Sequence, residues 1–516
     1  MSDAAAPSAG SPESSIAVTD SVDSRRLDVS QTLDPESRKS FGQFMTPAPV
    51  ARLMASMFSL QRKSVRLLDA GAGLGSLSAA CVDAMCHSAS AAGLTLDVTA
   101  IEQDARLTDH LQSTLLACTE RCQTAGVQFT SQLIAADFIE YALDLALEHG
   151  LYDEARLEQF DAAILNPPYL KIGAASAHRR RLRHMGIEAT NLYAAFVAIA
   201  IKMLRPGGEL VAITPRSFCN GPYFRPFRQM LISAMSLRRI HIYESRSDTF
   251  RDDKVLQETV ILHAIKNSTP PARVSITTGG QLDGSFVARA VPYADVVRPH
   301  DPDVFIHIAT NEDDQSLTDF VLRQPCTLGD LALEVSTGRV VDFRARDALC
   351  AEPEPGSVPL IYPAHFAAGF VDWPQAGKKP NAIRDVPATR ELLIPAGCYV
   401  LTRRFTSKEE RRRVVACIFD PARIPAEFTA VGLENHLNYF HAGGQGIGLA
   451  LARGLAAYLN STAVDRYFRQ FSGHTQVNAT DLRSLRYPSI TELERIGTTI
   501  DDRVADQTAV DAAVFG

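Results

Sequence analysis

Hydrophobic positions between residues 65 and 265 fall into short runs separated by longer segments with helical spacing. Alternation of strands and helices is typical of the α/β class, in which helices cover a mostly parallel sheet. The last two runs have no helical segment between them, so we expect them to form an antiparallel pair. The runs that predict strands are Val65–Asp69, Leu96–Glu102, Phe129–Ala135, Phe160–Leu165, Glu209–Thr214, Arg239–Tyr243 and Thr259–Ile265.

Two changes in pattern divide the chain. Residues 1–36 are rich in Ser, Ala, Asp and Pro and have no sustained apolar period, which predicts a disordered tail. Asn267–Pro271 (Asn-Ser-Thr-Pro-Pro) then ends the α/β pattern. We therefore expect one domain over residues 37–268 and a second over 272–516. The second has a helical pattern at residues 447–471, but its fold stays open.

Composition narrows the class of protein. The 516 residues are 46% hydrophobic and 22% charged, which fits a globular protein and excludes a wholly disordered chain. The longest apolar run, Leu192–Ile201, is shorter than the roughly 20 residues of a membrane span, and no secretory signal is expected. Nine scattered cysteines without a Cys-x-x-Cys pair predict a reducing, cytoplasmic location and no metal site. The net charge of −7 excludes a uniformly basic coat protein but allows a local basic surface.

Three successive strand ends carry groups that suit a nucleoside. After the first predicted strand, Leu67–Gly75 (Leu-Leu-Asp-Ala-Gly-Ala-Gly-Leu-Gly) allows a tight turn and close approach of the backbone to a ligand. Glu102, after the second strand, can accept both hydroxyl protons of a ribose. Asp137 and Phe138, after the third, offer an acceptor for an exocyclic amine and a flat face for its ring. We expect a nucleoside site at this edge of the sheet.

The fourth predicted strand ends at Leu165 and is followed by Asn166, Pro167, Pro168 and Tyr169. The two prolines fix φ and remove two amide donors, which freezes the loop and leaves its carbonyls to accept hydrogen bonds. Asn166 adds a side-chain carbonyl, and Tyr169 adds a flat face. Such a loop can accept two hydrogen bonds from a planar amino group, which directs the nitrogen lone pair towards an electrophile.

Together these segments resemble the class I S-adenosylmethionine-dependent methyltransferases that modify amino groups. Gly42–Pro47 (Gly-Gln-Phe-Met-Thr-Pro) and Asn191–Phe196 (Asn-Leu-Tyr-Ala-Ala-Phe) narrow the resemblance to the gamma class of N6-adenine DNA methyltransferases of type II restriction–modification systems. The resemblance covers residues 38–266. It implies a Rossmann-like, mostly parallel seven-stranded sheet and a separate C-terminal target-recognition domain. Ser472–Leu485 resembles the closing segment of such target-recognition domains. One departure is a long stretch between Gly75 and Glu102, with an insertion at residues 88–93.

The resemblance also implies roles for individual residues. The cofactor would be S-adenosylmethionine, and the target would be an adenine flipped out of duplex DNA. The catalytic loop would be Asn166, Pro167, Pro168 and Tyr169, and the base would be held by Tyr169 and Phe196. The residues that would bind the cofactor are Thr46, Pro47, Asp69, Gly71, Gly73, Gly75, Glu102, Asp137, Phe138 and Asn166.

Two basic stretches are candidates for contacts with double-stranded DNA, and a solvated charged surface is the alternative for each. The first, His178–His184, follows the catalytic loop; the second combines Arg403 and Arg404 with Lys408–Arg413, where we expect the run of arginines on a helix. Family analogy also suggests a cognate restriction endonuclease on a separate chain, and no membrane partner is expected. The tentative DNA-binding residues are Arg179, Arg180, Arg181, Arg403, Arg404, Arg411, Arg412 and Arg413.

Other functions stay open at this point. The Asn-Pro-Pro-Tyr loop suits planar amines generally, so the substrate could be a base in RNA or a glutamine amide in a protein. Gln43–Pro47 and the roughly 250 residues after the catalytic domain favour DNA. A non-catalytic DNA-recognition subunit is a further alternative, against which the intact loop argues. A nuclease activity in the same chain lacks a recognisable motif.

Overall fold

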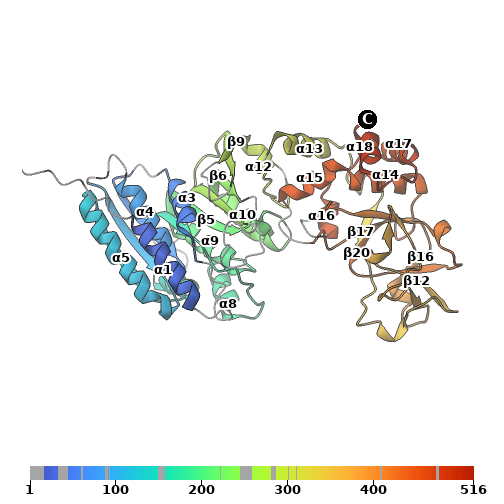
Figure 1. Cartoon of the computed structure of the whole chain (residues 1–516), viewed down its shortest axis with the longest axis horizontal. Coiled ribbons are helices and arrows are strands. Elements are labelled where there is room, and N and C mark those ends of the chain that lie inside the picture. The colour runs from blue at the N-terminus through green and yellow to red at the C-terminus, as the bar shows by residue number, and fades with distance from the viewer. Residues whose placement is uncertain are drawn as a thin grey trace, which may run out of the picture. The chain divides into compact units, whose positions relative to one another are not determined.

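The computed structural model describes residues 17–516 except 33–44, 60–61, 88–90, 92, 149–156, 158, 221, 244–258, 280–285, 300, 310, 407–409 and 472–475. The chain divides into two compact units (Figure 1). The first unit comprises residues 1–218 and 223–304, and the second comprises residues 219–222 and 305–516.

A mixed sheet forms the centre of the first unit, in the order β3-β2-β1-β4-β5-β7-β6-β8-β9. Strands β3 to β5 are parallel, and β7 runs antiparallel to both β5 and β6, which confirms the predicted antiparallel pair. All seven predicted strands are present. Their bounds are β1 Ser64–Ala70, β2 Thr95–Ile101, β3 Gln128–Ile134, β4 Phe160–Leu165, β5 Leu204–Pro215, β6 Met235–Ile242, β7 Thr259–Lys266, β8 Arg273–Thr278 and β9 Val287–Pro292.

Strands β8 and β9 correct both the predicted strand number and the predicted domain boundary. The sheet has nine strands rather than seven, because β8 pairs in parallel with β6 from Arg239↔Ser275 to Ile242↔Thr278. Val274 and Ile276 of β8 are buried in alternation with less buried neighbours, so one face of the added strand joins the core. The proline-rich segment before β8 therefore turns the chain without ending the domain, and the first unit continues to Val304.

Helices pack on both faces of the sheet. The central strand β4 is buried along its whole length, as expected of a strand covered on both sides. The apolar run at 192–201 lies in the buried helix α9, as its length predicted. Within the described residues, no helix combines the length and apolar character needed to cross a bilayer. The bounds are α3 Ala48–Ser56, α4 Ser76–Cys86, α5 Ala105–Ala125, α6 Phe138–Glu148, α8 Ala177–His184, α9 Leu192–Met203, α10 Arg225–Ala234 and α12 Tyr293–Val296.

The N-terminal region contains a helix that corrects the predicted disordered tail. Helix α1, Val18–Thr32, packs against α3, α4 and α5. Val18, Val22 and Val29 are buried at helical spacing, and the Thr19 hydroxyl donates to Asp83 Oδ2 over 2.6 Å. Tertiary packing of this narrow apolar stripe stabilises a helix that average composition does not favour. The rest of the predicted tail lies outside the described residues.

The second unit combines two sheets with a group of helices. A six-stranded sheet has the order β10-β20-β17-β18-β14-β13, and a five-stranded sheet has the order β11-β15-β12-β19-β16. The predicted helical region at 447–471 is confirmed as α14 and α15. The strands are β10 Glu334–Thr337, β11 Leu349–Cys350, β12 Ser357–Ile361, β13 Phe366–Ala367, β14 Phe370–Val371, β15 Ala382–Arg384, β16 Leu393–Pro395, β17 Tyr399–Arg403, β18 Ala416–Phe419, β19 Ala430–Leu433 and β20 Leu437–His441. The helices are α13 Glu312–Leu322, α14 Leu449–Asn460, α15 Thr462–Phe471, α16 Ala479–Arg483, α17 Ile490–Ile500 and α18 Gln507–Phe515.

Candidate active site

A cleft of about 720 Å³ lies at the carboxyl ends of β1, β2, β3 and β4. Parallel strands bring their carboxyl ends to one edge of a sheet, so motifs far apart in sequence meet there. The predicted residues that line this cleft are Thr46, Gly71, Gly73, Glu102, Phe138, Asn166, Pro168 and Phe196. The lining residues that the sequence did not single out are Met45, Ala72, Leu74, Ser76, Leu77, Ile101, Gln103, Leu107 and Ala136. Most of these residues are next to predicted ones in the sequence, so their position beside the motifs could have identified them as lining residues.

The glycine-rich turn leaves space open beside its backbone. Gly73 has φ of +57°, and a Cβ placed on it would meet no atom within 4 Å. A Cβ on Gly71 would lie 3.5 Å from Phe196 Cε1. Gly75 is different, because its Cβ would lie 2.9 Å from both Leu111 Cδ1 and Thr114 Cγ2 of α5. Gly75 therefore permits helix packing, whereas Gly73 keeps the cleft open.

Glu102 joins the end of β2 to the glycine-rich turn. Its Oε2 accepts the backbone N–H of Gly73 over 2.8 Å, and its Oε1 accepts that of Asp104 over 2.8 Å. Burial raises the pKa of Glu102 above the usual value, and these backbone hydrogen bonds act in the opposite direction. Each carboxylate oxygen can accept a second hydrogen bond, so the predicted contact with ribose hydroxyls remains chemically open.

Asp69 is outside the set of residues that line the cleft. The side chain is fully buried, and its Oδ2 accepts hydrogen bonds from the Ser78 backbone N–H at 3.1 Å and from the Ser78 hydroxyl at 2.6 Å. Burial raises the pKa of Asp69 to about 7. The structure therefore places Asp69 where it fixes the first turn of α4.

Asp137 and Phe138, which follow β3, have different roles in the structure. Asp137 Oδ1 caps α6 by accepting the backbone N–H groups of Ile139 at 2.8 Å and Glu140 at 3.0 Å. Its Oδ2 lies 3.1 Å from His178 Nε2 of α8, a partner that the sequence did not predict. Phe138 is buried on the cleft wall, whereas Asp137 is outside the lining set.

Phe196 packs against Phe138 on the wall of the cleft. Its ring centroid lies 5.1 Å from that of Phe138, and both rings line the cleft. The sequence predicted that Phe196 holds the target base. The structure places Phe196 beside Gly71, in the cleft that Asn166 and Pro168 also line, and its contact with a base stays a prediction.

The Asn-Pro-Pro-Tyr loop contacts the segment before α3. Asn166 Nδ2 donates to Thr46 Oγ1 over 2.9 Å, which fixes the orientation of the side-chain amide. The Tyr169 ring meets the Tyr193 ring edge to face, with centroids 6.1 Å apart, and burial raises the pKa of Tyr169. Tyr193 in turn lies 5.7 Å from Phe224. Tyr169 and Pro167 are outside the set that lines the cleft, as is Pro47, which precedes the first turn of α3.

Helix α1 contacts the segment that carries the lining residues Met45 and Thr46. Asp23 Oδ1 accepts the backbone N–H of Ala48 over 3.1 Å, at the start of α3, and also accepts Nε of the buried Arg26 over 2.7 Å. The Ser30 hydroxyl lies 3.9 Å from the sulfur of Met45. Sequence reasoning missed this role because it treated the region as disordered, although the spacing of the three buried valines was a usable signal.

The arginines of the first basic stretch bond to glutamates and a backbone carbonyl of the same chain. Arg179 pairs with Glu188 at 2.8 Å, and Arg181 pairs with Glu140 at 2.9 Å. Arg180 is exposed, and its Nη1 donates to a backbone carbonyl over 2.8 Å. The pair of Arg181 and Glu140 joins α8 to α6, and the proposed contacts with DNA stay a prediction.

The second basic stretch differs from its prediction in two ways. Residues 411–413 lie in the connection between β17 and β18, not on a helix. Arg413 is 1% exposed, and its guanidinium donates to the Thr406 hydroxyl over 3.1 Å. An arginine buried in this way does not reach a DNA surface, so its predicted contact is wrong. Arg403 lies over the Phe366 ring at 5.4 Å, and Arg404 donates to the Asn435 carbonyl over 2.6 Å.

Several predicted segments fall partly outside the described residues. These are the first part of the Gly42–Pro47 element, most of the insertion at 88–93, Lys408, and the beginning of Ser472–Leu485.

Comparison with known proteins identifies the family. Residues 90–250 match the family model described as Eco57I restriction-modification methylase. The chain is 44% identical to the type II methyltransferase M.PstI of Providencia stuartii over 96% of each chain. It is 41% identical to the type II methyltransferase M.BsuBI of Bacillus subtilis, over 94% of this chain and 95% of that one. The fold is similar to that of the type IIL restriction–modification enzyme MmeI in complex with DNA (TM-score 0.52, 10% identity, 95% of this chain and 74% of that one). The chain therefore belongs to the type II methyltransferases of restriction–modification systems.

Proposed function

We propose that this methyltransferase transfers a methyl group from S-adenosylmethionine to N6 of an adenine within a specific sequence of duplex DNA. The methylation would protect that sequence from a cognate restriction endonuclease on a separate chain. The observation that carries the proposal is the hydrogen bond from Asn166 to Thr46, which fixes the amide of an Asn-Pro-Pro-Tyr loop on the wall of the cleft.

The cleft fits the cofactor of this family, S-adenosylmethionine. The open space beside Gly73 would be filled by a Cβ, so the glycine leaves room for a ligand against the backbone. Glu102 would accept hydroxyl protons of the ribose, and Phe138 and Phe196 would contact the adenine ring. Asp137 would reach the exocyclic amine only by sharing or exchanging its contact with His178. When bound, the cofactor supplies an electrophilic methyl group.

The catalytic loop would act by holding the target amine. The Asn166 side-chain oxygen and a backbone carbonyl of the loop would accept the two N–H groups of the amine. These bonds direct the nitrogen lone pair out of the base plane. Because the prolines restrict the loop, little reorganisation is needed at the moment of reaction. Holding the amine in the correct direction would be the main contribution of the loop to the rate.

The target base has to leave the double helix to reach this loop. Tyr169 offers the flat face on which the base would stack, and its edge contact with Tyr193 sets the tilt of that face. Phe196 lines the same cleft as Asn166 and Pro168, and we propose that it helps to hold the base there. The second unit would then read the DNA sequence through base edges.

Duplex DNA is favoured over RNA or a protein glutamine by the high identity to two type II methyltransferases along nearly the whole chain. A non-catalytic recognition subunit is disfavoured by the meeting of Asn166, Gly73 and Glu102 at one cleft. A cytoplasmic location, where the host DNA is accessible, belongs to the same proposal.

Methylation of a plasmid of random sequence, followed by mapping of the modified bases, tests the function directly. We expect N6-methyladenine in one short sequence context. Methyl groups on cytosine, or incorporation only into added RNA or protein, would refute the proposal. A matched reaction with Asn166→Ala controls for contaminating methyltransferases.

A further inference from the structure

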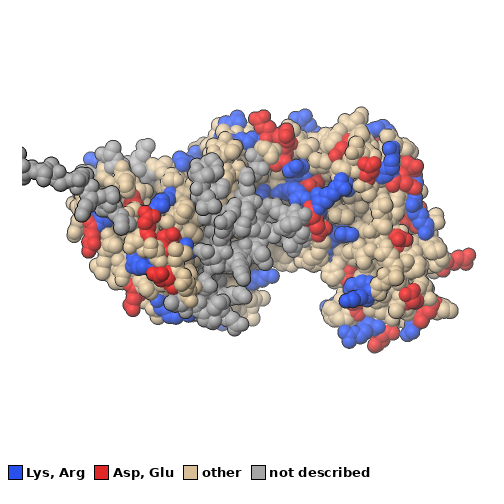
Figure 2. Space-filling model, viewed as in Figure 1, with Lys and Arg blue, Asp and Glu red and all other residues tan. Residues whose placement is uncertain are grey.

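A second concave site lies in the second unit and is rich in arginine. It is an open hollow of about 750 Å³ between residues 411–412, α15 and α18. Figure 2 shows Lys and Arg side chains gathered over α15. We call this site the arginine pocket; its lining residues are Arg411, Arg412, Thr462, Asp465, Arg466, Arg469 and Gln507.

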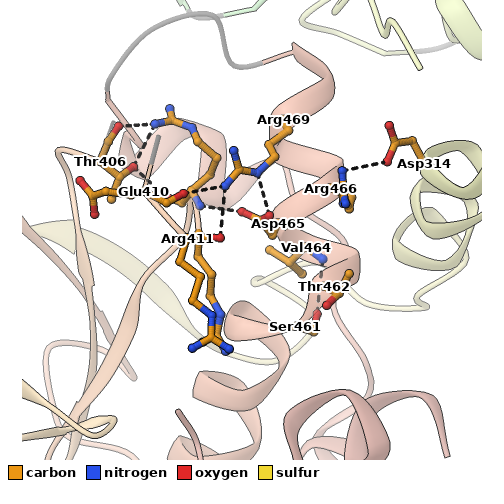
Figure 3. A network of polar contacts seen from close by, with 12 residues as sticks. Asp314, Thr406, Glu410, Arg411, Ser461, Thr462, Val464, Asp465, Arg466 and Arg469 are labelled. Atoms are coloured by element: carbon orange, nitrogen blue, oxygen red, sulfur yellow. Dashed lines mark hydrogen bonds and ion pairs between the residues drawn. The ribbon is translucent and has the colours of Figure 1, made fainter. Parts of the chain in front are cut away.

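One carboxylate holds the backbone of the pocket in place. Asp465 Oδ1 accepts the backbone N–H of Arg413 over 2.6 Å, and its Oδ2 accepts Nε of Arg469 over 2.7 Å (Figure 3). Arg469 also donates from Nη2 to the backbone carbonyls of Glu410 at 2.9 Å and Arg411 at 3.3 Å. Residues 410–413 are thereby fixed against α15.

Arg412 is held at one end and lacks a partner at the other. Its Nε donates to Gln507 Oε1 over 2.6 Å, and Gln507 Nε2 donates to Asp511 Oδ2 over 3.0 Å. Arg412 Nη2 is buried, and within the described residues it has no hydrogen-bond acceptor. A buried donor without an acceptor is costly, so an acceptor that reaches Arg412 Nη2 would be favourable.

The charges around the pocket favour an anion. Burial and the nearby Arg411 both lower the pKa of Arg412, as expected when two cations lie close together. Among the described residues Arg411 forms no ion pair, and it is exposed. Arg466 reaches Asp314 only at 3.7 Å, while Asp465 is already engaged by Arg469. A phosphate accepts several charge-assisted hydrogen bonds. Its negative charge would also offset the repulsion between the two cations.

We propose that the arginine pocket binds a backbone phosphate of the duplex DNA substrate, with Arg411 and Arg412 as its main ligands. The inference rests on the proposed function, because it takes the phosphate from DNA. Phosphate binding by this pocket would position the duplex without reading its sequence. Of the three consecutive arginines that the sequence predicted to contact DNA, the proposal keeps Arg411 and Arg412, because Arg413 is buried.

The test uses the full chain with Arg411→Gln and Arg412→Gln combined. A control with the same loss of charge, Lys378→Gln combined with Arg503→Gln, changes two exposed residues of the second unit outside the pocket. The dissociation constant is measured for a duplex that contains the mapped target sequence and for an unrelated duplex, at salt concentrations from about 50 to about 200 mM. Thermal melting and cofactor affinity are measured alongside.

We expect the pocket variant to bind both duplexes about tenfold more weakly at roughly 0.1 M salt for each phosphate that it no longer neutralises, and its salt slope to fall by about 0.9 per phosphate. Melting temperature and cofactor affinity should stay at the parent values. An unchanged affinity and salt slope, or a weakening equal to that of the control, would overturn the proposal. Weaker binding to the target duplex alone would also overturn it, because that pattern indicates base reading.

A separate arm distinguishes DNA from a free anion. If millimolar inorganic phosphate stabilises the parent chain but not the pocket variant, while the two chains bind DNA equally well, the pocket holds a small anion and the DNA proposal fails. DNA affinity is measured without methyl transfer, so the outcome is independent of the mapping experiment. Weaker DNA binding by the pocket variant, together with a parent chain that does not methylate adenine, would refute the proposed function and still support the pocket.

Discussion

Asn166 and Thr46 are 120 residues apart in the sequence and are joined by a hydrogen bond of 2.9 Å between their side chains. The bond links the loop after β4 to the segment that precedes α3, and both residues line the same cleft. Replacement of Thr46 by Val keeps the shape but removes the acceptor. We expect about a fivefold lower kcat/KM, which corresponds to roughly 1 kcal/mol for one hydrogen bond. Thr46→Ser, which retains the hydroxyl, should stay near the parent rate, and equal rates for Val and Ser would contradict the role.

Asn166 itself should matter more than its partner. Asn166→Ala removes an acceptor for the target amine, and removal of a transition-state hydrogen bond of this kind lowers the rate by about 10²–10³. Cofactor affinity should stay nearly unchanged, because the glycine-rich turn and Glu102 are intact. Initial methylation rates and calorimetric titration of S-adenosylmethionine measure the two effects separately. A parent-like rate would show that the loop has been wrongly assigned.

Gly73 should control cofactor binding rather than DNA binding. Its Cβ would project into open space at the cleft, so Gly73→Val should block the ligand and weaken cofactor affinity. The residue also has φ of +57°, which costs a side chain about 1–2 kcal/mol in stability. Gly356→Ala is a matched control for this strain, because Gly356 has φ of +82° and open space around it in the second unit. If calorimetry gives the same cofactor affinity for Gly73→Val and the parent, the site is elsewhere.

Asp23 should influence the cleft from α1. Asp23→Ala removes the acceptor for the Ala48 backbone N–H and should loosen the segment that carries Met45 and Thr46. We expect a few-fold weaker cofactor affinity, consistent with about 1 kcal/mol for removal of a cap. The exposed Asp28 of the same helix provides the control Asp28→Asn. A lower melting temperature with unchanged cofactor affinity would mean that α1 only stabilises the fold.

Asp69 should make stability depend on pH. Its pKa in the folded protein is raised to about 7, above the roughly 3.9 of an unfolded chain, so between these values the folded state holds the proton more tightly. The contribution of Asp69 to stability should therefore fall as pH rises from about 4 to 7, by at most about 1.4 kcal/mol per pH unit. Asp69→Asn should flatten this part of the melting-temperature profile. Identical profiles for the variant and the parent would contradict the burial effect.

The chemistry at the strand ends could be predicted from the order of residues in the chain. Leu67–Gly75, Glu102 and Asn166–Tyr169 each follow a recognisable strand, and parallel strands of one sheet bring their carboxyl ends together whatever the details of packing. The cleft and about half of its lining residues could therefore be predicted from the sequence.

Which side chains face the cleft and which stabilise the fold depends on contacts that form only in the folded protein. Phe196 is on an apolar helix whose residues are nearly all buried, so periodicity could not say that it packs on Phe138. Asp137 caps a helix, and Arg413 is buried, although their residue types suggested ligand contacts. Helix α1 is stabilised by burial against three other helices, a gain that composition does not record. In each case the deciding contacts are between residues far apart in the chain, and local patterns carry no information about those distances.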